Sequence, residues 1–123
     1  MKLNSARIFV DDIAAAKSFY SQSLAFPLLH GGEDYGFFVF RTGNVDFIVE
    51  LVPSDAPADD RSLVGRFTGL SFTVTDIQSK YAEMLGKGIP FSGKPEAQSW
   101  GGILATFKDP AGNELQLVQQ AAV

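Results

Sequence analysis

The side chains that could do acid-base, nucleophilic or metal chemistry are few in this sequence of 123 residues. It holds one histidine, His30, and no cysteine, which excludes thiolate zinc sites, disulfide scaffolds and cysteine nucleophiles. No Gly-x-Ser-x-Gly sequence, histidine pair or glycine-rich phosphate loop occurs, so nucleophile-triad chemistry is excluded too. Glu50 stands in the apolar run IVELV at 48–52, where a lone carboxyl group away from water could serve as a general base.

Arg7 offers a simpler interpretation of Glu50. Side chains alternate between the two faces of a strand, so Arg7, in the first predicted strand, can share a sheet face with Glu50. An ion pair that neutralises both groups is as well supported as a role in substrate binding or proton transfer. His30 stands beside Gly31-Gly32, where a solvated turn residue is favoured over a metal ligand or catalyst. Both interpretations of Glu50 stay open at this point.

The composition limits the partners that the chain could have. Ten Lys and Arg residues against fourteen Asp and Glu residues give a net charge of −4, which disfavours nucleic acid and membrane surfaces as partners. No apolar run approaches the length of a membrane span, and MKLNSARIF lacks the apolar core of a signal peptide, so we expect a cytoplasmic protein. The 11 Phe, 3 Tyr and 1 Trp residues favour an aromatic-lined cavity for a small molecule.

The first half of the chain predicts one helix and four strands. Asp11-Asp12 offers the N-cap of the helix, and Pro27 ends it. Apolar residues recur along this helix at spacings of three and four, which gives one buried stripe: Ile13, Ala16, Tyr20 and Leu24. The strands are expected over 3–10, 28–30, 35–41 and 45–52. The turns between the last three are Gly31-Gly32 and Gly43-Asn44.

The second half repeats this order after a stretch over 53–65 that is rich in Pro, Asp, Ala and Ser, which indicates a surface connection without regular structure. A strand over 67–75 leads into a helix capped by Asp76, whose stripe is Ile77, Tyr81, Met84 and Leu85. Three more strands are expected over 89–91, 102–108 and 114–119. We therefore predict one domain over 1–123, with a first module at about 3–53, a linker at about 54–66 and a second module at about 67–120.

The two halves also match residue by residue, because FVDDI at 9–13 resembles TVTDI at 73–77 and VELV at 49–52 resembles LQLV at 115–118. With FVDDIAAAKSFYSQSLAF at its start and WGGILATFKDPAGNELQLVQ at its end, the chain resembles the vicinal oxygen chelate superfamily of glyoxalase I, extradiol dioxygenases and bleomycin-resistance proteins. The resemblance implies an α+β fold in which two βαβββ modules form a cupped mixed β-sheet, with helices outside and a ligand inside. It also implies a homodimer.

Catalytic members of this superfamily hold a divalent metal with one side chain from each of four strands, normally His or Gln, Glu, His and Glu. The matching positions in this chain are Ser5, Glu50, Gly69 and Gln116. Only Glu50 is a convincing ligand, and a divalent metal needs three or four good donors, so we expect neither a metal nor another cofactor. Phe9 stands where glyoxalase I relatives often carry an arginine that contacts glutathione. This chain therefore lacks that contact with glutathione.

The implied cup defines the candidate ligand-binding residues. Strand alternation places the following residues on its inner side: Ser5, Arg7, Phe9, Ile48, Glu50, Gly69, Ser71 and Gln116. The third strand adds Phe38 and Phe40 or, alternatively, Phe37 and Val39, and the sequence does not decide between the two pairs. Trp100, in QSWGG, could stack on a ligand or cover a dimer seam, with plain packing equally well supported.

These residues predict a metal-free protein that binds or sequesters an aromatic or amphipathic small molecule, such as an antibiotic, in a dimeric cup. The alternative is a lyase, isomerase or dioxygenase of the same superfamily that uses a degenerate metal site at Glu50. A third interpretation is a regulatory module with a vestigial pocket. Metal analysis separates the first two interpretations, and a stable protein partner would identify the third.

Overall fold

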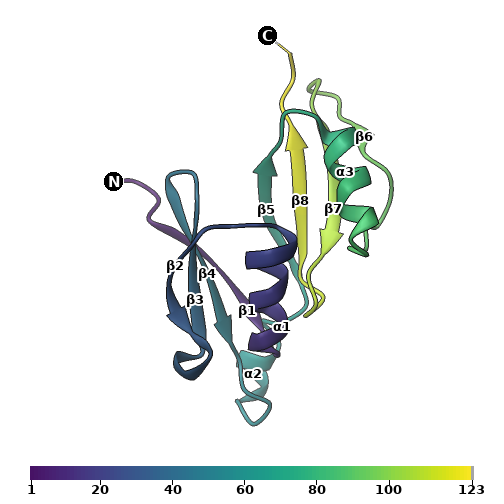
Figure 1. The fold of residues 1–123 in the computed structure, drawn as a ribbon. Coiled ribbons are helices and arrows are strands. Elements are labelled where there is room, and N and C mark those ends of the chain that lie inside the picture. The colour runs from purple at the N-terminus through teal and green to yellow at the C-terminus, as the bar shows by residue number, and fades with distance from the viewer. Residues whose placement is uncertain (123) are drawn as a thin grey trace. The chain divides into compact units, whose positions relative to one another are not determined.

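The computed structural model describes residues 1–122 and divides them into two compact units (Figure 1). Unit 1 contains Met1–Arg66 and Pro110–Asn113, and unit 2 contains Phe67–Asp109 and the chain from Glu114 onward. Each unit has its own four-stranded mixed sheet, so the predicted α+β fold with two βαβββ modules is confirmed. None of the helices in the described chain has the length and apolar character needed to cross a membrane.

Unit 1 is a sheet in the order β1-β4-β3-β2, in which β1 runs parallel to β4 and the other neighbours are antiparallel. Its strands are β1 (Ser5–Val10), β2 (Leu28–Gly32), β3 (Phe37–Thr42) and β4 (Val45–Leu51). Its helical segments are α1 (Ile13–Ser18), the π-helical turn η1 (Phe19–Ser23), the 3₁₀ turn η2 (Glu33–Tyr35) and α2 (Ala58–Arg61).

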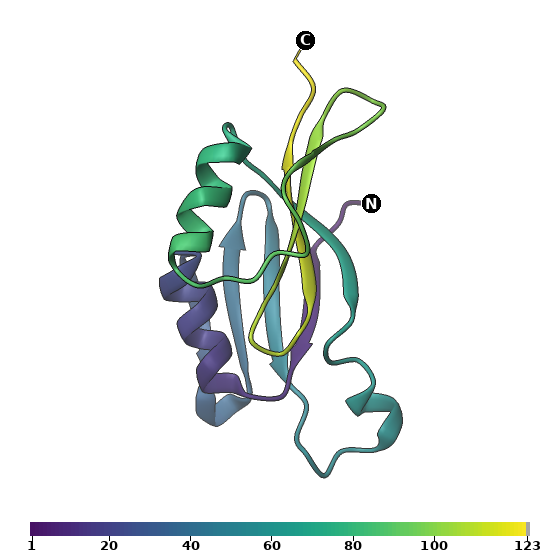
Figure 2. The ribbon, with the colours of Figure 1, turned by 90° about the vertical axis from the view of Figure 1, so that its right-hand side faces the viewer.

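The helix of unit 1 begins where the sequence predicts it. The Asp12 carboxylate accepts a hydrogen bond from the Ala15 backbone N–H at 3.0 Å, which satisfies one of the free donors at the helix start. Figure 2 shows this helix lying along one face of the sheet. Beneath it the fully buried Tyr20 ring lies 6.1 Å from Phe40 and 5.3 Å from Phe47, centroid to centroid. This aromatic cluster is the core of unit 1.

The turn over 109–113 serves unit 1 through its last residue, the buried Asn113. The Asn113 side-chain oxygen accepts from the backbone N–H groups of Gly65 at 2.9 Å and Arg66 at 3.4 Å. Its amide nitrogen donates to the Phe9 carbonyl at 2.7 Å. The side chain thus ties the end of β1 to the backbone of Gly65 and Arg66, and a structural role accounts for this asparagine.

Unit 2 is a sheet in the order β5-β8-β7-β6, with β5 parallel to β8. Its elements are β5 (Phe67–Thr73), α3 (Ile77–Gly86), β6 (Glu96–Ala97), β7 (Ile103–Lys108) and β8 (Glu114–Gln119). Asp76 caps α3 by accepting from the Ser79 backbone N–H at 3.2 Å and from its hydroxyl at 2.8 Å. The core beneath α3 contains Ile77 and Met84, as predicted, whereas Leu85 is exposed.

Several predicted boundaries are wrong. Gly31-Gly32 belongs to β2, and the turn that follows is η2. The stretch over 89–91 forms only a single bridge, between Phe91 and Phe107, because Pro90 has no N–H to donate to a ladder; the edge strand β6 lies further on. The connection over 53–65 holds one helical turn, α2, where the Arg61 Nε donates to the Ala56 carbonyl at 3.0 Å.

Candidate functional site

The strand register of unit 1 brings six of the candidate side chains onto one face of its sheet. Phe9 and Phe37 are the in-register neighbours of Glu50, on β1 and β3 respectively. In the next row, Arg7 and Val39 flank Ile48 in the same way. We call this surface the Glu50 face: Arg7, Phe9, Phe37, Val39, Ile48 and Glu50. It lies opposite the face that packs on α1, because the alternate residues Ile8 and Val49 are buried in the core.

An ion pair occupies the middle of the Glu50 face. The Arg7 guanidinium donates to the Glu50 carboxylate at 2.7 Å, and the two side chains are 49% and 38% exposed. Of the two interpretations that the sequence leaves open for Glu50, the structure therefore shows the ion pair. A carboxylate held by a guanidinium is available to orient a polar ligand, but it is not a lone base in an apolar cup.

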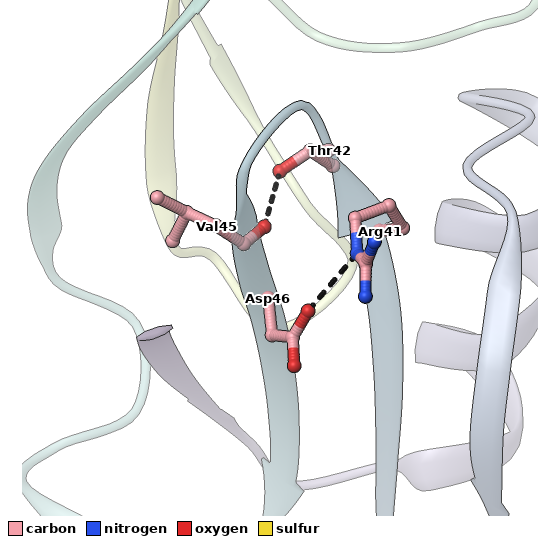
Figure 3. Close-up of polar contacts among 4 residues, drawn as sticks. All are labelled: Arg41, Thr42, Val45 and Asp46. Carbon is pink, nitrogen blue, oxygen red and sulfur yellow. Dashed lines mark hydrogen bonds and ion pairs between the residues drawn. The ribbon is translucent and has the colours of Figure 1, made fainter. Parts of the chain in front are cut away.

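A second ion pair lies on the same face of the sheet, at the β3-β4 turn (Figure 3). The Arg41 Nε donates to Asp46 at 3.1 Å, and the Thr42 hydroxyl lies 3.5 Å from the Val45 carbonyl, which it donates to across the turn. Ser5 is the in-register neighbour of Asp46 on β1. The Ser5 position is thus beside this second ion pair and two residues along the strand from Arg7.

The prediction that Phe38 and Phe40 line the ligand site is wrong. Their side chains are 1% and 0% exposed and belong to the core under α1. Register explains this placement, because Phe38 pairs with Val49 and Phe40 with Phe47, both of which face α1. The alternative pair, Phe37 and Val39, has the strand parity of the Glu50 face; Phe37 is partly exposed there, whereas Val39 is itself buried.

Gly69, the implied ligand position on β5, lies in a break in the strand ladder. Phe67 pairs with Glu114 and Ser71 with Gln116, so β5 has two more residues than β8 between these pairs. Gly69 has φ of +75°, a conformation in which a Cβ is strained. The Thr68 hydroxyl supports the break by donating to the Glu114 carbonyl at 2.8 Å and accepting from the Leu70 N–H at 3.1 Å. Backbone geometry alone therefore accounts for glycine at this position.

The four implied metal-ligand positions do not fit a divalent ion. The Glu50 carboxylate is already paired with Arg7, and the Gln116 amide nitrogen donates to the Thr106 hydroxyl at 3.1 Å. Ser5 is a poor ligand and Gly69 has no side chain. Among residues 1–122, no group of three His, Asp or Glu side chains is placed to hold a metal ion. We therefore derive no step through a metal.

Unit 2 contains a pocket that the sequence did not predict. It has a volume of about 320 Å³, and its polar lining residues are Ser92, Lys94, Glu96, Gln98, Thr106 and Gln116. We call it the Lys94 pocket. Ser71, Gln116 and Thr106 are in-register neighbours on β5, β8 and β7, so one sheet face forms its floor and the loop before β7 its wall. Of the sequence candidates, only Gln116 lines it; the loop residues were missed because they follow no periodic pattern.

Trp100 and His30 take no part in the Lys94 pocket. The Trp100 indole is half exposed and covers Gly102, where any Cβ would overlap the ring. Its turn is held by the Gln98 N–H, which donates to the Gly102 carbonyl at 2.8 Å. His30 is exposed on β2 rather than in a turn, and its ring lies 6.3 Å from that of Phe37, at the edge of the Glu50 face.

A family model matches residues 2–117 of the chain, and its description is Glyoxalase/Bleomycin resistance protein/Dioxygenase superfamily. The chain belongs to this superfamily. A curated relative, the uncharacterized protein YraH of Bacillus subtilis (strain 168), is 27% identical over 95% of this chain and 97% of its own length.

Solved structures of similar proteins agree with this superfamily assignment. A superfamily member from Sphaerobacter thermophilus DSM 20745 is 29% identical, with a TM-score of 0.79 over 98% of both chains. TnmS3, an antibiotic binding protein from Streptomyces sp. CB03234, is 24% identical with a TM-score of 0.74 over 98% of this chain and 97% of its own. A lactoylglutathione lyase from Agrobacterium tumefaciens is 16% identical with a TM-score of 0.76 over 96% and 92%. The last two show a shared fold, which serves both binding proteins and enzymes.

Proposed function

We propose that this superfamily member binds an aromatic or amphipathic small molecule on the Glu50 face without a metal ion. The observation that carries the proposal is the 2.7 Å ion pair between Arg7 and Glu50. It occupies the one carboxylate among the four positions that catalytic relatives use for metal, and it leaves a fixed polar group between aromatic side chains. Such a surface suits a ligand with a flat apolar body and one or two polar substituents.

The aromatic residues around Glu50 support this ligand class. The Phe9 and Phe37 side chains flank Glu50 in register, and the rings of Tyr35 and His30 lie 6.2 Å and 6.3 Å from that of Phe37. Aromatic rings contribute most of the binding energy at such surfaces, while the ion pair fixes the orientation. The shared fold with TnmS3, which is an antibiotic binding protein, supports sequestration of an antibiotic as one form of this function.

The homodimer and the cytoplasmic location belong to the same proposal. Membership of the superfamily and the length of the chain support a dimer of two copies with equivalent binding sites. The net charge of −4 separately disfavours nucleic acid as a partner. Light scattering on the purified chain tests the dimer: we expect twice the 13.3 kDa mass of one chain, and a monomer at all concentrations would contradict it.

The binding function is tested with a panel of aromatic and amphipathic drugs and metabolites, read as thermal shifts with and without a metal chelator. A ligand at one hundred times its Kd should stabilise the protein by about 2.7 kcal/mol, in chelator as much as without it. Phe37→Leu should weaken the best ligand, because it removes a ring from the Glu50 face. Tyr81→Leu is the matched control: its ring packs on Phe91 at 4.8 Å in unit 2.

Three results would contradict the proposal. One is the absence of any shift across the panel. Another is a ligand whose effect disappears in chelator and returns with added zinc, nickel, manganese or iron, which would favour the lyase, isomerase or dioxygenase interpretation. The third is a ligand that Phe37→Leu and Tyr81→Leu weaken equally, which would place the site elsewhere.

A further inference from the structure

The Lys94 pocket has the size of a small-molecule site and is built within unit 2 alone. Its volume of about 320 Å³ falls at the lower end of the range for ligand pockets, which suits a molecule of amino-acid or dipeptide size. Its apolar lining is limited to Leu104, Ala105 and Gly93, so a large apolar ligand has little to bury against. The polar groups that line the pocket therefore determine which class of ligand fits it.

Two opposite charges line this pocket without neutralising each other. Glu96 is the first residue of β6 and Lys94 lies two residues before it. Within residues 1–122, neither the Lys94 ammonium group nor the Glu96 carboxylate forms an ion pair or a hydrogen bond. The floor offers two more groups. Gln116 uses its amide nitrogen on Thr106, which leaves the Gln116 side-chain oxygen as an acceptor and the Thr106 hydroxyl proton as a donor.

These groups discriminate between ligand classes. A phosphate or nucleotide would meet only one cation and would be repelled by the Glu96 carboxylate. A sugar needs an aromatic ring to stack on, and no aromatic residue is among those that line the pocket in the described chain. A molecule that carries both a carboxylate and an ammonium group can satisfy Lys94 and Glu96 together, through two charge-assisted hydrogen bonds.

The wall of the pocket is held in place before any ligand arrives. At one end, the Ser92 N–H donates to the Thr106 carbonyl at 2.9 Å. At the other, the Gln98 amide nitrogen donates to the Glu96 carbonyl at 3.0 Å, and the Gln98 N–H to the Gly102 carbonyl at 2.8 Å. A fixed wall lowers the entropy cost of binding, which matters for a ligand with few atoms.

We infer that the Lys94 pocket binds a small zwitterion of the amino-acid or dipeptide class, with its carboxylate on Lys94, its ammonium group on Glu96 and its remaining polar atoms on Thr106 and Gln116. This inference goes beyond the proposed function and does not depend on it. The aromatic ligand contacts the Glu50 face in unit 1, whereas the zwitterion contacts unit 2.

Binding is tested by NMR on the ¹⁵N-labelled chain, titrated with each free amino acid and with glycylglycine up to its solubility limit. We expect saturable shifts of the backbone amides over 92–94, 96–98 and 104–106, and of the Gln116 side-chain amide. The strongest binder is then compared with its N-acetyl and its carboxamide derivatives. Each derivative lacks one charge and should bind at least about tenfold more weakly, as expected for the loss of one charge-assisted contact.

Variants assign each charge to its partner. Lys94→Met should abolish the preference for the carboxylate over the carboxamide, and Glu96→Gln should abolish the preference for the free amine over the N-acetyl form. Lys108→Met, at the far end of β7, is the matched control and should keep both preferences. The inference is overturned if no probe shifts these amides, if the singly charged derivatives bind as well as the zwitterion, or if Lys94→Met and Glu96→Gln leave both preferences unchanged.

Discussion

Arg7 on β1 and Glu50 on β4 form a 2.7 Å ion pair between neighbouring parallel strands, although they are not in-register neighbours. The neighbour of Glu50 is Phe9, so the Arg7 side chain reaches along the strand to the carboxylate. The pair lies beside the aromatic side chains of the Glu50 face. Glu50 stands at a position that catalytic relatives use as a metal ligand, and here its carboxylate is bound to Arg7. The function proposed for this chain rests on that relationship.

The Arg7–Glu50 pair should contribute to ligand binding far more than to stability. Both side chains are well exposed, so a double-mutant cycle with Arg7→Met and Glu50→Gln should give a coupling of no more than about 1 kcal/mol in urea unfolding. Each single change should nevertheless weaken the best panel ligand, because it removes the group that orients the ligand. Calorimetric titration of the variants with that ligand measures this effect.

The Arg41–Asp46 pair is the matched control for this cycle. It lies on the same face of the sheet, spans 3.1 Å and has similar exposure, 52% and 35%. We expect Arg41→Met and Asp46→Asn to show a similarly small coupling and unchanged ligand affinity. If ligand affinity falls equally in both cycles, the general charge of the face, and not the Arg7–Glu50 pair, controls binding.

Phe37 and Phe38 are adjacent in sequence and should respond oppositely to truncation. Phe38→Ala should cost about 3 to 5 kcal/mol of unfolding free energy, because its side chain fills the core beneath α1. Phe37→Ala should cost no more than about 2 kcal/mol, because its side chain is partly exposed. Urea unfolding measures both values, and equal losses would mean that the register of β3 is shifted by one residue.

Gly69 and Gly86 should respond to alanine with opposite signs. Gly69→Ala should lower the unfolding free energy by about 1 to 2 kcal/mol, because φ of +75° is unfavourable for a residue with a Cβ. Gly86→Ala, at the end of α3 with open space around the position, should raise it by about 0.4 to 1 kcal/mol. If both changes stabilise the protein, β5 is regular at Gly69, and backbone conformation does not explain the glycine at this position.

Asp76 should make α3 sensitive to acid. The hydrogen bond from the Ser79 backbone N–H, and then that from its hydroxyl, hold the pKa of Asp76 below its ordinary value of 3.8. Because the folded pKa is lower than the unfolded one, the ionised carboxylate stabilises the fold above the unfolded pKa. This contribution is lost as pH falls through the folded pKa. The stability advantage over Asp76→Asn should therefore be present at neutral pH and be lost as pH falls from the unfolded pKa through the lower folded pKa. Unfolding measured across pH tests this, and a constant difference would contradict the assignment.

The sequence predicted the modules well because the signals that define them are local. The N-caps at Asp12 and Asp76 and the helix stripes follow from side-chain chemistry within a few residues. The alternation of apolar residues alone does not assign the faces of the third strand, but the position of its one charged residue agrees with the face that the structure shows. Arg41 has the same strand parity as Phe37 and Val39, and a charged residue marks the face away from the core.

The Lys94 pocket could not be predicted from the sequence. Its wall is a loop whose shape depends on hydrogen bonds to distant residues, such as that from Ser92 to Thr106. The prediction of a strand over 89–91 was wrong for a related reason, because the formation of an edge strand depends on its partner strand more than on its own composition. The break at Gly69 was equally hidden, because a glycine in a strand pattern indicates a bulge without giving its register.

The most direct test of the account is a calorimetric titration of chelator-treated protein with zinc and with nickel, for the unmodified chain and for Glu50→Gln. We predict that neither ion gives a saturable one-to-one isotherm and that the best organic ligand of the panel binds with the same Kd in chelator. One equivalent of metal bound tightly per chain, and lost in Glu50→Gln, would contradict metal-free binding.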